Sequence, residues 1–142
     1  MTARVGHRTK TELEAAVCAE MTRQRLSHEH RSLRFRVREE TGGTPDYAPA
    51  IVARRGPILF LVEPIADARA TEAIGQLTRF LEQHSTDIVL VVVTPDEAYR
   101  TIPLEAYDEI YPASDVRRLT TRIRQQDLKG IVRPFEKPRP AG

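Results

Sequence analysis

Two carboxylates, Asp46 and Glu63, stand at opposite ends of a stretch whose sequence predicts a β-hairpin. Asp46 opens one expected strand, Glu63 closes the next, and the turn is expected to centre on Arg55-Gly56. That register places Asp46 opposite Ile65, so Glu63 becomes its diagonal neighbour on the same face, roughly 7–8 Å away or less. Carboxylates at this separation can share a hard divalent cation, Mg²⁺ or Mn²⁺. Glu14, near the start of the first expected helix, is the candidate third carboxylate.

The helices that position these groups are marked by capping residues and apolar spacing. Thr11-Glu-Leu-Glu14 is a capping box, which predicts a helix beginning with Thr11 as N-cap and ending near residues 27–30. Its buried face is predicted from residues that recur at helical spacing: Leu13, Ala16, Val17 and Met21. A second amphipathic helix is expected over residues 69–84, and Ser114 is expected to cap the last one.

Strands are expected between and after these helices. Alternating or continuous apolar residues predict three strands after the first helix, over residues 33–37, 47–53 and 57–63. Pro49 indicates an edge or a bulge in the second of them, and the third is apolar on both faces and therefore central. The second helix then leads to a buried strand at 88–93, which predicts a right-handed parallel crossover. Residues 96–113 show no regular pattern.

The order of these elements predicts an α/β fold, an αβββαβα sandwich with a mixed central sheet. One domain is expected over residues 9–128, between a flexible N-terminus at 1–8 and a proline-rich tail at 129–142. A single cysteine in 142 residues excludes an internal disulfide scaffold. Because every apolar run is too short to cross a bilayer and no apolar leader is visible, we expect a cytoplasmic protein without a membrane partner.

Charge is distributed unevenly along the chain. Residues 1–38 carry a net +5, residues 39–116 carry −9, and residues 117–142 carry +6. Basic ends around an acidic middle fit either an anionic partner or ends that fold back onto the middle. The candidate nucleic-acid-binding side chains are arginines of the expected strands: Arg34, Arg36, Arg38, Arg54 and Arg55. The first three equally suit a solvated edge strand that charge protects from aggregation.

Four features in fixed order resemble the PD-(D/E)XK nuclease superfamily over roughly residues 11–93. They are Thr11-x-x-Glu14 on a helix, Pro45-Asp46 at a strand start, an apolar strand ending in Glu63, and Gln76-Leu77 on the next helix. The resemblance implies a restriction-endonuclease-like core and a metal-dependent phosphodiesterase. In such an enzyme Asp46 and Glu63 would hold Mg²⁺ or Mn²⁺, Glu14 would support them, and Gln76 or Arg79 would position the scissile phosphate.

One departure from the superfamily concerns catalysis itself. The motif lysine, two residues after the acidic ligand, is here Ile65, which can neither orient water nor stabilise charge at phosphorus. No lysine lies between Lys10 and Lys129, so none within the core can replace it.

The primary expectation is therefore a nuclease-like domain without catalysis that either binds nucleic acid or serves in assembly, with DNA or a protein as its partner. One alternative is a Mg²⁺-dependent DNA endonuclease with an atypical site. Another is a protein-interaction subunit with no nucleic-acid ligand. By analogy with small nuclease-like domains, a homodimer would address both strands of a duplex.

Two further features carry weaker predictions. His28 and His30 alternate and could bind a metal together, although a solvated loop is the simpler interpretation. Cys18 follows Glu14 by one helical turn and has no companion thiol, which favours a small apolar or partly exposed residue over a nucleophile.

Overall fold

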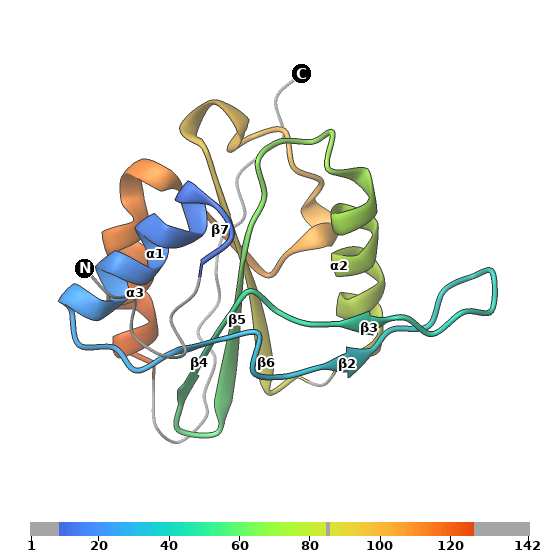
Figure 1. Cartoon of the computed structure of the whole chain (residues 1–142), viewed down its shortest axis with the longest axis horizontal. Coiled ribbons are helices and arrows are strands. Elements are labelled where there is room, and N and C mark those ends of the chain that lie inside the picture. The colour runs from blue at the N-terminus through green and yellow to red at the C-terminus, as the bar shows by residue number, and fades with distance from the viewer. Residues whose placement is uncertain (1–8, 85, 127–142) are drawn as a thin grey trace.

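The fold was analysed in a computed structural model, which describes residues 9–84 and 86–126 (Figure 1). The expected N-terminal segment 1–8 and the proline-rich tail 129–142 lie outside the described residues. Within those ranges no helix has the length and apolar character that a membrane span requires.

Three helices and a five-stranded mixed sheet form an α/β fold, as the sequence predicted. The helices are α1 (Glu12–Arg23), α2 (Thr71–Gln83) and α3 (Val116–Arg124). The strands of the main sheet are β1 (Glu29–His30), β4 (Ile51–Arg55), β5 (Ile58–Pro64), β6 (Ile88–Thr94) and β7 (Glu109–Pro112). In space they follow the order β1-β4-β5-β6-β7, antiparallel from β1 to β5 and parallel from β5 to β7.

The sheet lies between two layers that each bury one of its faces (Figure 1). Helices α1 and α3 cover one face, and Val17 and Leu119 pack there against Phe60 of β5. Helix α2 covers the other face with a separate two-stranded sheet, β2 (Phe35–Arg36) and β3 (Asp46–Tyr47). Because β5 is apolar on both faces it occupies the centre of the sheet, and the predicted parallel crossover to β6 is confirmed.

The turn of the hairpin is centred one residue later than predicted, so each residue of one strand pairs two residues further along the other. Ile51 pairs with Val62 and Arg55 pairs with Ile58, so the turn is Gly56-Pro57. The expected strand 47–53 is also divided, because residues 48–50 leave the ladder around Pro49, which has no N–H to donate. Its first part becomes β3, outside the main sheet.

The end of α1 also differs from the prediction. The helix ends at Arg23 rather than near residues 27–30, and Arg25 adopts a left-handed φ of +58°. The N–H of Leu26 donates to Met21 O (2.8 Å), and that of Arg25 donates to Thr22 O (3.0 Å). These two bonds form a Schellman motif, which satisfies the last carbonyls of the helix and turns the chain toward β1.

Four other local predictions were wrong. Ala16 is exposed, and only residues 35–36 of the expected strand 33–37 pair as strand. Residues 96–113, predicted irregular, contain β7 at an edge of the sheet. Ser114 does not cap α3, because its N–H donates to the Asp96 carboxylate (2.9 Å) and Asp115 occupies the N-cap position.

Candidate functional site

Glu14 is buried in the first turn of α1, where Thr11 is the N-cap as predicted, although the Glu14 carboxylate accepts from Lys10 N–H rather than from Thr11 N–H. Its backbone N–H donates to the Thr11 hydroxyl (3.0 Å). Its carboxylate accepts hydrogen bonds from Arg31 Nη1 (3.0 Å), His30 Nδ1 (2.7 Å) and the Lys10 backbone N–H (3.3 Å). Burial raises the pKa of Glu14, but these bonds outweigh it and leave the pKa below its ordinary value. Glu14 is therefore an ionised group held between the Arg31 guanidinium and the His30 ring, with little of its surface open to a ligand.

Arg31 adopts an unfavourable backbone conformation. Its φ of +52° lies in the left-handed region, which is unusual for a residue with a long side chain. The backbone N–H donates to Ala50 O (3.2 Å) beside the β1–β4 pair, and both terminal guanidinium nitrogens reach Glu14. The two-pronged contact with Glu14 thus ties the end of β1 to the start of α1.

Glu63 closes β5 and is buried in a different way. Its two carboxylate oxygens accept hydrogen bonds from the Tyr47 hydroxyl (2.9 Å) and from the Ala50 backbone N–H (2.8 Å). Burial raises its pKa to about 7, although those two bonds and the charge of Arg31 pull the pKa down. Both donors are neutral groups of the protein itself, so the charged form has no direct cationic partner.

Asp46 does not form the predicted pair with Glu63. It lies exposed on β3, opposite Arg36, while its neighbour Tyr47 takes the inward position and reaches Glu63. Gln76 Nε2 donates to the backbone oxygen of Asp46 (3.4 Å), which joins α2 to β3 through the main chain. These residues do not fit a shared Mg²⁺ or Mn²⁺ ion, because Glu63 uses both oxygens internally and Asp46 faces outward.

The motif position of the missing lysine is part of the core. Ile65 is 5% exposed and packs among the apolar residues between the sheet and α2. Within residues 9–84 and 86–126, Glu14, Asp46 and Glu63 do not form a cluster of three metal-binding groups.

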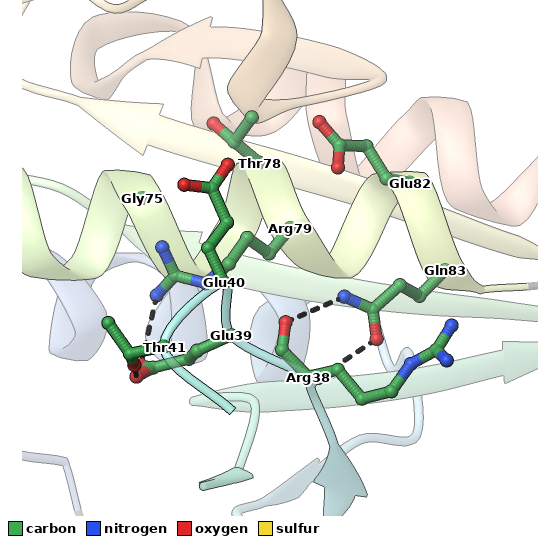
Figure 2. A pocket seen from close by; sticks show the side chains of 9 residues that line it. All are labelled: Arg38, Glu39, Glu40, Thr41, Gly75, Thr78, Arg79, Glu82 and Gln83. Carbon is green, nitrogen blue, oxygen red and sulfur yellow. Dashed lines mark hydrogen bonds and ion pairs between the residues drawn. The ribbon is translucent and has the colours of Figure 1, made fainter. Parts of the chain in front are cut away.

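The predicted arginines lie in a region of mixed charge. Arg34, Arg36, Arg38 and Arg54 are exposed and Arg55 is partly buried. Arg38 lines an open hollow of about 870 Å³ between the β2–β3 loop and α2 (Figure 2). Three acidic residues line the same hollow: Glu39, Glu40 and Glu82. Gln83 fixes the loop by bonding the backbone of Arg38 at both N and O (2.9 Å each), and Arg79 pairs with Glu39 (3.3 Å).

A second groove, which the sequence analysis missed, is lined by arginines and neutral polar residues. It lies between the end of α1 and the surface of α3, has a volume of about 450 Å³, and is lined by Arg23, Gln24, Arg25, Arg117, Thr121 and Arg124. We call it the arginine groove. No acidic residue lines it, although Glu20 forms an ion pair with Arg23 (2.6 Å). The spacing of residues 117, 121 and 124 places them on one helical face, a pattern that the sequence does contain.

Cys18, His28 and His30 also come together, through a strand that the sequence analysis did not predict. Cys18 Sγ lies 3.3 Å from His28 Nε2, and the rings of His28 and His30 meet edge to face with centroids 5.4 Å apart. Burial raises the pKa of the Cys18 thiol, so the structure does not activate it as a nucleophile.

Comparison of this chain with protein-family models, with curated proteins and with solved structures finds no match. The likeness to the PD-(D/E)XK superfamily therefore rests on the residues and on the order of the elements alone.

Proposed function

We propose that this chain is a non-catalytic nucleic-acid-binding domain that contacts the phosphate backbone through the arginine groove. The observation that carries the proposal is the lining of that groove: four arginines, one glutamine and one threonine, with no acidic residue among them. Glu20 binds Arg23 and Gln24, which leaves Arg25, Arg117 and Arg124 as the arginines without that counter-charge. Guanidinium groups match phosphate oxygens in shape and charge, and amide and hydroxyl groups donate to the same oxygens.

The backbone of Arg25 supports a binding role for this groove. The left-handed position after a helix end favours glycine, and an arginine there costs roughly 1 kcal/mol in stability. That conformation places the guanidinium in the lining of the groove. The Schellman motif requires that backbone conformation, but it does not require an arginine, so the side chain at this position is free to serve the groove.

The nuclease-like residues support the non-catalytic part of the proposal. The two carboxylate oxygens of Glu63 accept hydrogen bonds from Tyr47 and Ala50, and Ile65 is buried among apolar side chains. The buried Glu63 carboxylate already accepts an internal hydrogen bond on each oxygen, and the exposed Asp46 supplies no partner ligand. The arrangement offers phosphate contacts without a phosphodiester-cleaving centre.

Fluorescence anisotropy with labelled single-stranded DNA, duplex DNA and RNA, over a series of salt concentrations, tests the binding. The double variant Arg117→Gln/Arg124→Gln is expected to weaken binding at least tenfold. Its slope of log affinity against log salt should become shallower by about 0.7–0.9 for each phosphate that the variant no longer neutralises. The matched control Arg34→Gln/Arg36→Gln removes two exposed arginines from β2 and its approach, and should change little. Equal weakening in both variants would mean that the groove has no special role.

Arg25→Gly separates binding from folding. Glycine relieves the left-handed backbone, so this variant is expected to gain about 0.5–1 kcal/mol in stability while it loses affinity for nucleic acid. A variant that binds as wild type does would remove Arg25 from the interface.

Two other outcomes would replace the proposal. Metal-dependent cleavage of DNA or RNA that Asp46→Ala abolishes would establish an endonuclease. Binding to polyglutamate as tight as binding to nucleic acid would favour an acidic protein partner.

A further inference from the structure

We propose that Cys18, His28 and His30 form a Zn²⁺ site that joins the edge strand β1 to α1. One ligand atom from each residue lies within 4.8 Å of those from the other two, and Cys18 Sγ is 3.3 Å from His28 Nε2. Ligands about 2.0–2.3 Å from a tetrahedral zinc ion are about 3.5 Å apart. The cluster is therefore close to the size of a zinc site, and this inference does not depend on the proposed function.

The spacing of the residues along α1 and β1 explains why they meet. Glu14 and Cys18 lie one turn apart on a single helical face, separated by about 6 Å along the axis. His30 and His28 lie two residues apart on one face of the strand segment, separated by about 6.6 Å. Because the two spacings are similar, two pairs of side chains meet between the helix and the strand: Glu14 with His30, and Cys18 with His28.

The second bonds of the two imidazoles orient them for metal binding. His28 Nδ1 lies 2.8 Å from the backbone oxygen of Leu26, and His30 Nδ1 lies 2.7 Å from Glu14 Oε2. Both acceptors require a proton on Nδ1, so the neutral form of each ring carries its lone pair on Nε2. Metal-binding histidines are oriented by a backbone carbonyl or a carboxylate in this way.

The ligand set selects the metal. One thiolate and two imidazoles favour Zn²⁺ over Mg²⁺ or Ca²⁺, which prefer oxygen ligands. On binding, the Cys18 thiol loses its proton to the buffer, and the metal takes the sulfur lone pair. Three protein ligands leave a fourth position for water or an external ligand.

Metal titration of the full chain tests the site. Chelator-treated protein should bind one Zn²⁺ per chain in calorimetry, and Zn²⁺ should raise the Tm. Cys18→Ser and His28→Gln should each weaken binding by more than about 100-fold, beyond the 10–100-fold loss typical of changes to groups that only orient a ligand. His84→Gln, which changes a histidine stacked on Phe80 at the end of α2, should bind as wild type does.

A second readout needs no variant and so is independent of folding defects. Co²⁺ bound to the wild-type chain should show a thiolate-to-metal charge-transfer band, because Cys18 is the one cysteine in the sequence. Zn²⁺ added in excess should remove that band. Binding of Co²⁺ without the band, no metal binding at all, or unchanged affinity in Cys18→Ser would each overturn the proposal.

Discussion

Glu14 and Glu63 are two buried carboxylates that the same fold treats in opposite ways. Glu14 lies on the α1 side of the sheet, between Arg31 and His30, and its pKa is lowered. Glu63 ends the central strand β5, accepts from a phenol and a backbone N–H, and has a pKa raised to about 7. Burial pushes both values upward, so the charge of the direct partners decides the sign of the net shift.

The opposite pKa shifts distinguish a permanently ionised structural cluster around Glu14 from Glu63, whose charge depends on pH. The Glu14 cluster is ionised and ties three segments together, namely the start of α1, the end of β1 and residue Lys10. Glu63 instead has a pKa of about 7, so its protonation changes with pH in the physiological range. The nuclease motif matches both residues by position, but neither has the open carboxylate that a metal ion needs.

The largest effect is expected from Glu14→Gln. The amide keeps the shape but leaves the Arg31 guanidinium, whose side chain is 25% exposed, without its counter-charge. We expect a loss of about 3 kcal/mol in the free energy of unfolding, somewhat below the cost of breaking a fully buried pair. Urea unfolding at pH 5 measures it, with Glu63→Gln as the matched control that should lose less than about 1 kcal/mol. Similar losses of unfolding free energy in both variants would contradict the prediction that only Glu14 belongs to an ion cluster that stabilises the fold.

Glu63 should make stability fall as pH rises. Its pKa is about 7 in the folded chain and 4.5 in the reference state, so the folded state retains a proton that the unfolded state releases. Stability should therefore decline between pH 5 and 8, by about 2–3 kcal/mol from this group. Besides burial, the groups that influence the pKa of Glu63 are the Ala50 backbone N–H, Tyr47, Arg31 and Glu14.

Comparison with Glu63→Gln isolates this contribution. The variant should lack that part of the pH dependence and be at least as stable as wild type at pH 8. Parallel curves of unfolding free energy against pH for the two proteins would contradict the prediction.

A smaller effect is expected from Tyr47→Phe. The change removes the hydroxyl that donates to Glu63 Oε2 and leaves the ring in the aromatic contacts with Phe35 and Phe80. We expect a loss of about 1 kcal/mol at pH 5 and about 2 kcal/mol at pH 8, where the bond is charge-assisted. Chemical denaturation at both pH values measures it, and a loss independent of pH would argue that Glu63 stays neutral throughout.

The smallest effect is expected from Thr11→Ala. This change removes the hydroxyl that accepts from the Glu14 N–H at the start of α1. A lost N-cap costs about 1 kcal/mol, and Glu14 retains its side-chain partners. Thermal unfolding should show a lower Tm with an unchanged pH dependence. A loss as large as that of Glu14→Gln would mean that the cap, and not the ion cluster, holds the helix start.

Much of the architecture could be predicted because it depends on local pattern. The capping box of α1, the apolar run of β5 and the crossover to β6 each follow from neighbouring residues and their periodicity. By contrast, β1 and β7 carry little pattern of their own and exist because they pair with strands distant in the sequence. Their two to four residues are too few to show a period.

The candidate sites divide in the same way. The sequence by itself determined which residues carry charge or bind metals, that Glu14 begins a helix, and that the lysine of the nuclease motif is absent. Only the tertiary structure decided that Glu63 accepts from Tyr47 rather than facing Asp46, and that Cys18 meets His28 and His30. The break in the ladder around Pro49 moved Asp46 and Tyr47 out of the main sheet and into a separate one. Contacts between distant segments depend on that geometry, which no local spacing of residues contains.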